Sequence, residues 1–262
     1  MRTAIAIVAL LASTASADKT KTPTDELKTT LNDQLNWGTS NSPRFAFHKD
    51  KTAPLGSDVY ASLSMGDIDP QNVVIGFSSD GKDAFVASDL REYGDCGGSG
   101  NCGVTLGWLH ASILYEKDGG RWEPAVWHVA ELSAGAAGDP IARKIEDADD
   151  AVKVFETTLG DPKAFAKTVS DRKEVVLYGS DKGERFVGGA KVKGKLTSWN
   201  LTLTVHDGVQ AGLSSGKTLA WVAANVDARP AKKPKAAAQP YRVLVIYEKT
   251  GATWKIVSLM FS

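Results

Sequence analysis

An eight-residue segment of this chain occurs twice, and this repetition constrains the fold more than any single motif. The first copy, residues 115–122, reads YEKDGGRW, and the second, residues 247–254, reads YEKTGATW. Five of the eight positions are identical, and a single offset in numbering aligns all of them. A match at a fixed separation is typical of a chain that repeats one supersecondary arrangement. We therefore expect two related halves.

The similarity extends upstream of the repeated segment. Residues 85–90 (FVASDL) align with residues 221–226 (WVAANV), and an irregular loop follows each of them. Each loop leads into a predicted strand, a turn, and a second strand that begins with Trp122 or Trp254. The same order in both halves favours duplication over a chance match.

The N-terminal segment, residues 1–17, has the pattern of a signal peptide. Arg2 precedes an apolar run over residues 4–12, and residues 15–17 form an A-x-A cleavage site, so we expect cleavage after Ala17. The apolar run is shorter than the roughly 20 residues that span a bilayer, and no later segment approaches that length. The sequence predicts an exported protein, periplasmic or secreted, without an integral membrane segment; a cytosolic protein is the alternative.

The charge balance argues against a polyanionic partner. The chain has 31 basic and 31 acidic residues, and removal of residues 1–17 takes away only Arg2, which leaves 30 against 31. A net charge near −1 gives no general attraction to nucleic acid or anionic lipid. The hydrophobic content of 42% is sufficient for a core in each half.

The local patterns predict helices followed by strands in each half. Thr22-Pro23 reads as an N-cap and first helical residue, and the leucines that follow at intervals of four form one apolar face. Asp-Gly turns then separate short strands. In the second half a helical stripe is followed by a short helix that begins at Pro162, and then by strands from Val175 onward. The apolar residues of the stripe are Ile141, Ile145, Ala148, Val152, Phe155 and Leu159.

This order predicts an α+β fold rather than alternating βαβ units. The small, Gly-rich segment around residues 134–140 marks a linker. We therefore expect a first domain over residues 22–133 and a second domain over residues 141–262.

The second half resembles a known family. Residues 175–188 (VVLYGSDKGERFVG), 198–199 (SW), 220–222 (AWV) and 254–262 (WKIVSLMFS) resemble the SnoaL-like branch of the nuclear transport factor 2-like superfamily. The resemblance covers most of residues 148–262. It implies a cone, in which a curved antiparallel sheet wraps around N-terminal helices and leaves a pocket at its open end. The first half lacks the GERFVG string and is a divergent copy, so the expected architecture is two tandem cone-like domains.

The resemblance leaves the function open, because the family includes polyketide cyclases, ketosteroid isomerase relatives, dehydratases and non-catalytic binding domains. Its catalytic members aim an Asp or a His into the cone. A His often stands six residues after the Trp of the last strand; here that position holds His128 in the first half and Met260 in the second. This places any catalysis in the first cone and makes the second an apolar binding or structural domain.

A candidate set for proton transfer follows in the first half. Trp108 and His110 share one face of a predicted strand, because side chains alternate along a strand. Together with His128 and Asp89 they could form a pocket that moves a proton next to a carbonyl, with Trp108 as an apolar wall.

Each residue of this set also has a structural interpretation. His110 could lie on the outer face of the sheet, which its counterpart Arg242 favours. His128 could be a core histidine that bonds to a backbone carbonyl. Asp89 could have a structural role alone, as a residue that ends its strand together with Arg91.

Two cysteines lie in a Gly-rich loop. In an exported protein, Cys96 and Cys102 are expected to form a disulfide that closes this short loop. Two thiols without a nearby His are too few for a metal site, and no motif calls for a cofactor. No metal or cofactor is therefore expected.

The leading prediction is an exported, non-catalytic binding protein for a small apolar or amphipathic molecule or for a protein partner. The expected ligand-binding residues are Trp108, His128, Trp221 and Met260. One alternative is an isomerase- or cyclase-type enzyme that uses His128 and Asp89, with His110 as a further candidate. Another is an envelope assembly or scaffold module, in which the two domains pair within the chain or the protein forms a homodimer.

Overall fold

The computed structural model describes residues 21–37, 45–48, 52–54, 67–93, 105–131, 139–181 and 183–262. The predicted signal peptide (residues 1–17), the predicted disulfide (Cys96 and Cys102) and nearly all of the predicted linker (residues 134–140) lie outside the described residues. No helix within the described ranges is both long enough and apolar enough to cross a membrane.

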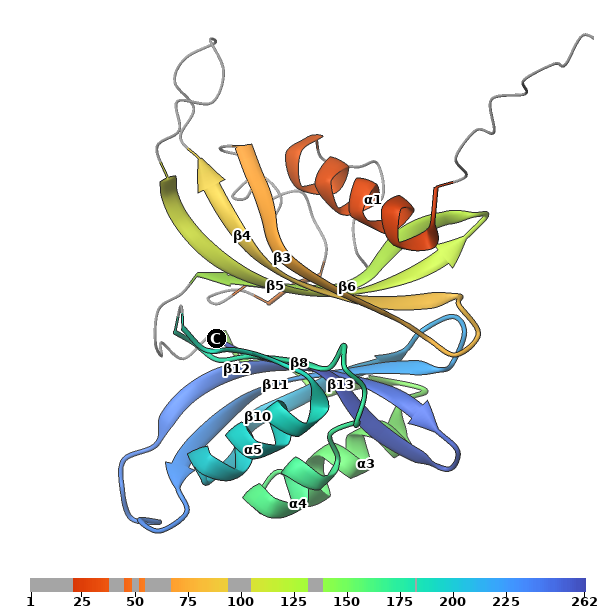
Figure 1. Ribbon diagram of the computed structural model, residues 1–262. Coiled ribbons are helices and arrows are strands. Elements are labelled where there is room, and N and C mark those ends of the chain that lie inside the picture. Colours follow the sequence, from red (N-terminus) through yellow and green to blue (C-terminus); the bar gives the residue numbers. More distant parts are fainter. Residues whose placement is uncertain are drawn as a thin grey trace, which may run out of the picture.

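In the described parts of the chain, the strands form two sheets that face each other (Figure 1). The first sheet has the order β2-β1-β6-β5-β4-β3, and the second has the order β7-β10-β11-β12-β13-β8-β9. The strands of the first sheet are β1 (Phe45–His48), β2 (Thr52–Pro54), β3 (Asp67–Phe77), β4 (Asp83–Tyr93), β5 (Thr105–Asp118) and β6 (Arg121–Glu131). Those of the second are β7 (Lys144–Glu146), β8 (Val176–Tyr178), β9 (Arg185–Val187), β10 (Leu201–Leu213), β11 (Leu219–Pro230), β12 (Gln239–Thr250) and β13 (Thr253–Phe261).

Apart from the additional edge strand β7 of the second sheet, the described strands of the two sheets share one order. In each, four long strands pair antiparallel in sequence order, and a short strand adds in parallel to the last of them: β1 to β6, and β8 to β13. The register shifts after Leu114 in the β5–β6 pair and after Ile246 in the β12–β13 pair, each directly before its copy of the repeated octapeptide. The octapeptide forms the turns of these two hairpins. Gly119 (φ 53°) and Gly251 (φ 60°) occupy equivalent left-handed turn positions there, which explains why the repeat keeps a glycine at this place.

Helices cover the outer face of each sheet (Figure 1). α1 (Pro23–Trp37) lies on the first sheet, and α3 (Asp149–Thr158), α4 (Pro162–Lys167) and α5 (Gly189–Trp199) lie on the second. α1 begins where the sequence predicts, because the Thr22 hydroxyl accepts from the Asp25 backbone N–H at 3.2 Å. α4 also begins as predicted, with the Asp161 carboxylate accepting from the backbone N–H of Lys163 at 2.8 Å.

Two sequence predictions for the second half were wrong. The helical stripe was expected to start at Ile141, but the helix begins at Asp149, and residues 144–146 form the edge strand β7 instead. Residues beyond Val175 were expected to be strands only, but α5 interrupts them. Gly189 allows this helix to start close to the preceding loop, because a Cβ there would collide with the Ser170 carbonyl.

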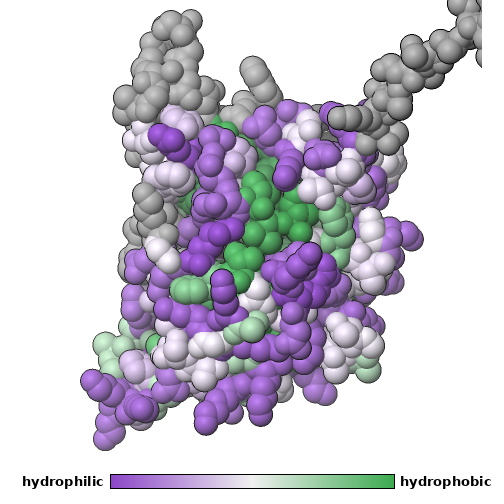
Figure 2. All heavy atoms as spheres, viewed as in Figure 1, coloured by the Kyte–Doolittle hydropathy of each residue, from purple (hydrophilic) through white to green (hydrophobic). Residues whose placement is uncertain are grey.

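Each sheet has a core on its helix-covered face. In the first half, Leu27 and Leu31 of α1 pack over the sheet, and the partly buried Ile75 and Phe77 of β3 border this core. Figure 2 shows an apolar area on the upper half of the molecule, in the region where β3 passes beneath α1. In the second half, α3, α4 and α5 lie in the corresponding space, with Phe155, among others, fully buried.

A third apolar layer lies between the two sheets. It contains Phe85 and Leu114 from the first sheet and Trp221, Leu244 and Ile246 from the second, all buried. The two halves therefore pair within one chain, through the sheet faces that point away from the helices. Central strands such as β4, β11 and β12 are in consequence buried on both faces along most of their length.

The same glycine–aromatic pair recurs on this inner face of each sheet. Gly76 is the cross-strand partner of Phe85 in the first sheet, and Gly212 is that of Trp221 in the second. A Cβ at Gly76 would collide with the Phe85 ring, and one at Gly212 would lie 2.8 Å from the Trp221 Nε1 atom. The absent side chain leaves room for the ring to lie flat across the neighbouring strand.

Two equivalent tyrosines offer a matched test of core polarity. Tyr115 and Tyr247 are the first residues of the two repeated segments, and both are fully buried. The Tyr115 hydroxyl donates to Gln34 Oε1 at 2.7 Å, whereas the Tyr247 hydroxyl has no hydrogen-bond partner among the described residues. Tyr115→Phe should therefore lower the free energy of unfolding by about 1 kcal/mol, and Tyr247→Phe should leave it unchanged or raise it. Urea denaturation of both variants measures the difference; equal losses would contradict the assignment.

Burial of Tyr247 predicts a loss of stability at high pH. Burial raises the pKa of Tyr247 above its ordinary value. Since the unfolded phenol ionises near pH 10 and the folded one resists ionisation, this contribution to stability is full below about pH 10 and falls as the pH rises further. Tyr247→Phe should therefore flatten the alkaline side of the stability profile. An unchanged slope in this variant would show that other groups cause the loss.

Candidate functional site

The structure brings two of the predicted catalytic residues together at the contact between the sheets. Asp89 of β4 and His110 of β5 are cross-strand partners, and His110 Nδ1 lies 3.0 Å from Asp89 Oδ1. His110 is only 2% exposed. The two side chains point toward the second half of the chain, where Tyr178 of β8 stacks on the imidazole at a ring distance of 4.0 Å.

Residues from both halves surround the Asp89 carboxylate. Asn72, in the bulge of β3, donates to Asp89 Oδ2 at 2.7 Å, and Arg185 Nε of β9 lies 4.0 Å from the same oxygen. Burial raises the pKa of Asp89, but the close contact with His110, the hydrogen bond from Asn72 and the nearby positive charges together lower it below its ordinary value. Burial, followed by the charge of Asp89, raises the pKa of Tyr178. This part of the interface therefore holds an ionised carboxylate next to a neutral phenol.

His128 lies elsewhere on the same inner face. It is fully buried, and its Nε2 atom lies 3.0 Å from the Ser262 hydroxyl of the second half. Its cross-strand neighbour Ser112 makes a second contact of this kind, at 2.9 Å from the hydroxyl of Ser258. His128 is thus a packing and hydrogen-bonding residue between the two sheets.

These positions correct the expectation that Asp89, His110 and His128 share a pocket inside the first cone. The helix-facing side of β5, where a pocket inside the cone would lie, carries Leu109, Ala111 and Ile113. His110 does point away from the helices, as its counterpart Arg242 suggested, yet the second sheet covers it.

The predicted ligand-binding residues also lie on or near this contact. Trp221 is 2% exposed in the apolar layer, and Met260 is fully buried beside Tyr178. Trp108 is partly buried, with the Arg91 guanidinium 5.9 Å from its ring centre. None of the three, nor His128, lines either of the two cavities described below.

The second sheet carries a polar pair equivalent to Asp89 and His110. Asn225 and Arg242 are cross-strand partners, and Arg242 Nε donates to Asn225 Oδ1 at 3.0 Å. Arg242 is 1% exposed, and its Nη2 donates to the Asp139 carbonyl at 2.6 Å. The Asn225 amide donates in turn to Asp207 Oδ2 at 2.8 Å. The two sheets thus carry cross-strand polar pairs at equivalent positions of their inner faces, Asp89–His110 in the first and Asn225–Arg242 in the second.

One cavity opens on the helix-covered side of the second half. Its volume is about 290 Å³, and Trp199 of α5, Tyr241 of β12 and Phe261 of β13 supply its aromatic lining. The Phe261 ring lies nearly perpendicular to both others, at 86° and 5.9 Å from Trp199 and at 84° and 6.0 Å from Tyr241. The other lining residues are Gly179, Ser180, Asp181, Glu184, Leu201 and Gln239.

Local structure explains how Trp199 comes to this place. α5 ends at Asn200, which adopts the left-handed conformation (φ 49°) and turns the chain directly into β10. Trp199 therefore stands at the junction of helix and sheet. Phe186 of β9 supports it from a further perpendicular contact at 6.3 Å.

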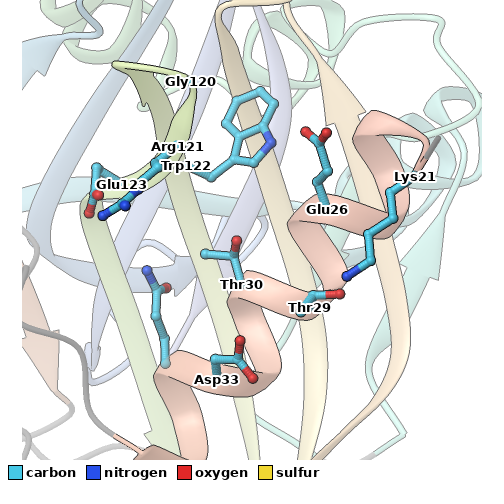
Figure 3. A pocket seen from close by; sticks show the side chains of 10 residues that line it. Lys21, Glu26, Thr29, Thr30, Asp33, Gly120, Arg121, Trp122 and Glu123 are labelled. Atoms are coloured by element: carbon cyan, nitrogen blue, oxygen red, sulfur yellow. The ribbon is translucent and has the colours of Figure 1, made fainter.

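A second cavity, of about 400 Å³, lies between α1 and the β5–β6 turn of the first half (Figure 3). Trp122 and the helix residue Thr30 lie on opposite sides of it. Its charged lining is mixed: Lys21, Glu26, Asp33, Arg121 and Glu123. This mixture favours no single class of ligand.

The sequence did not single out Trp199, Tyr241 and Phe261 as a site. They come from three elements that are far apart along the chain, and no local spacing connects them. A partial signal existed, since the segment that contains Asp181 and Glu184 carried the family resemblance. Within the described ranges, no group of three or more His, Cys, Asp or Glu residues could hold a metal ion.

Comparison with known proteins gives similarity over part of the chain only. No family model matches, and no curated protein matches. Among solved structures, an NTF2-like protein of unknown function from Pseudomonas putida is 12% identical over 45% of this chain and 89% of its own, with a TM-score of 0.35. A putative ketosteroid isomerase from Parabacteroides distasonis is 12% identical over 43% and 83%, with a TM-score of 0.34. An NTF2-like protein from Shewanella oneidensis is 18% identical over 44% and 98%, with a TM-score of 0.32.

Proposed function

We propose that this protein binds a small molecule with an apolar body in the cavity formed by Trp199, Tyr241 and Phe261, and that it does not convert this molecule. The aromatic lining of this cavity is the observation that carries the proposal. Ligand sites are typically concave and mostly apolar, with few polar groups that fix orientation. A volume of about 290 Å³ is at the lower end of such sites and suits a small ligand.

We also propose that the chain consists of two tandem SnoaL-like cones, with residues 22–133 and 141–262 as the domains. The common strand order, the equivalent register shifts and the repeated glycine–aromatic pairs support this proposal. Export with cleavage after Ala17 remains part of it, and the N-terminal mass of the protein purified from its native source would test that step.

The positions of the predicted catalytic residues argue against the enzyme alternative. His128 and Asp89 contact different partners: His128 contacts Ser262 between the sheets, and Asp89 accepts from the exposed Asn72 of its own sheet. A general base has to reach the proton that it removes. Neither residue lines the aromatic cavity, so a ligand bound there would not meet them.

The scaffold alternative has one distinct expectation. In members of this fold that assemble, the sheet face is a natural surface for pairing, but here the two sheets of one chain cover each other. We therefore expect a monomer in solution. Light scattering that gives twice the chain mass would favour the assembly role instead.

Trp199→Ala tests the binding site directly. Loss of this ring should weaken the binding of a neutral apolar dye such as Nile red about tenfold or more, because buried Trp residues dominate the binding energy of small sites. Fluorescence titration measures the change, with circular dichroism to confirm folding. Trp108→Ala is the matched control, since Trp108 is a partly buried tryptophan outside the cavity. An unchanged affinity in Trp199→Ala, or an equal loss in both variants, would refute the proposed site.

A further inference from the structure

The aromatic cavity carries charge of one sign. Asp181 and Glu184, from the turn between β8 and β9, are its charged lining residues among those described. The other polar lining groups, Ser180 and Gln239, are neutral. The cavity of the first half, by contrast, is lined by both basic and acidic side chains.

The negative charge acts on the cavity wall itself. Burial raises the pKa of Tyr241, a hydrogen bond with Ser180 lowers it, and the charges of Glu184 and Asp181 raise it further. The two carboxylates are therefore close enough to Tyr241 to oppose a second negative charge. By the same electrostatics they would stabilise a positive charge beside this ring.

The aromatic rings have a complementary preference. The face of a Trp, Tyr or Phe ring carries partial negative charge and attracts ammonium groups. One such contact already exists in this cluster, because Lys195 Nζ lies 4.8 Å from the Phe186 ring centre and 5.1 Å from that of Trp199. Lys195 does not line the cavity, so the cavity side of the cluster remains available to a ligand.

The arrangement of the rings suits a compact cation. The rings of Trp199 and Tyr241 both stand nearly at right angles to the ring of Phe261. The three rings thus form walls of the cavity that face in different directions. A methylated or alkylated ammonium would contact ring carbons through its apolar substituents while its charge faces the carboxylates. A carboxylate or phosphate ligand would meet repulsion from the same two acids.

We propose that the cavity of the second half binds organic cations, namely quaternary or protonated amines carried on an apolar body. This inference rests on the proposed binding function and specifies its ligand class. The three exposed lysines of the β11–β12 loop, Lys232, Lys233 and Lys235, do not line the cavity, so their positive charges are not part of the proposed cation site.

Paired probes of equal shape test the ligand class. Benzyltrimethylammonium and neopentylbenzene differ in replacing N⁺ by carbon, and both can be assayed by displacement of Nile red. In the unmodified protein, the cation should bind about tenfold more tightly than its neutral isostere. The double variant Asp181→Asn/Glu184→Gln should reduce this preference to near equality by weakening the binding of the cation. The backbone contact between Gly179 N–H and the Glu184 carbonyl persists in that variant, so the turn should fold.

The matched control is Glu26→Gln/Asp33→Asn, which removes two acids from the cavity of the first half and should not alter the preference. Equal affinities of the two probes for the unmodified protein would overturn the cation assignment and leave the binding function intact. A preference that survives in Asp181→Asn/Glu184→Gln would overturn the role of the carboxylates. Failure of the dye and of both probes to bind would overturn the proposed function as well.

Discussion

Replacement of Trp221 by alanine should lower the free energy of unfolding by about 3–5 kcal/mol, the range for a buried Trp truncated to Ala. Trp221 is 2% exposed and lies in the apolar layer between the sheets. Its cross-strand partner is Gly212, which has no side chain to fill the space left behind. Urea denaturation would measure the loss.

This experiment also separates two interpretations of Trp221. Its position predicts a large loss of stability with unchanged binding of Nile red, whereas the sequence had suggested a ligand contact. Trp199→Ala should show the opposite pattern, a modest loss of stability with a large loss of binding. If Trp221→Ala abolishes dye binding while the protein keeps its stability, our assignment of the cavity is incorrect.

The second large effect is expected at the buried polar pair of the second sheet. Asn225→Leu removes the oxygen that accepts from Arg242 Nε and leaves a guanidinium, 1% exposed, with fewer partners. Loss of a buried hydrogen bond to a charged group typically costs about 1.5–3 kcal/mol. We therefore expect a loss of this size in the free energy of unfolding of Asn225→Leu.

A double-mutant cycle gives the control. Arg242→Met removes the buried charge, so the double variant Asn225→Leu/Arg242→Met should be more stable than Asn225→Leu alone. Chemical denaturation of the four proteins measures the coupling. Strictly additive losses would show that Asn225 and Arg242 do not act as a pair.

The parts of the fold that were predictable depend on local chemistry. The Thr22 cap, the Pro162 helix start and the glycines of the two repeated turns each fix the backbone within a few residues. The similarity of the two halves was visible for the same reason, since the repeated turn needs a glycine at one position. These features depend on neighbouring residues in the sequence, so they can be predicted without knowledge of the tertiary packing.

The faces of the strands could not be assigned from alternation. Alternation shows which side chains share a face, but it identifies the inside only when the other face is polar. Here the central strands are buried on both faces, one by helices and one by the partner sheet. His110 and His128 therefore had no sequence signature that distinguished a pocket from the contact between the sheets.

The cavity was hidden for a different reason. The sequence of α5, which positions Trp199, contains two glycines, which disfavour a helix, and the sequence therefore predicts only strands in this region. Without this helix, Trp199 had no predicted neighbours, and its approach to Phe261 depends on the closure of the whole sheet. Only tertiary structure creates that proximity.

Because the two sheets pair within one chain, the two surfaces of their contact need not have the same sequence, as they would in a symmetric homodimer. In a two-fold dimer each surface meets its own copy, so a substitution appears on both sides at once. Here His128 faces Ser262, while the position equivalent to His128 is Met260 in an apolar setting. The linkage also keeps the local concentration of the partner surface constant at any dilution. Such a chain can specialise one half for stability and the other for a ligand.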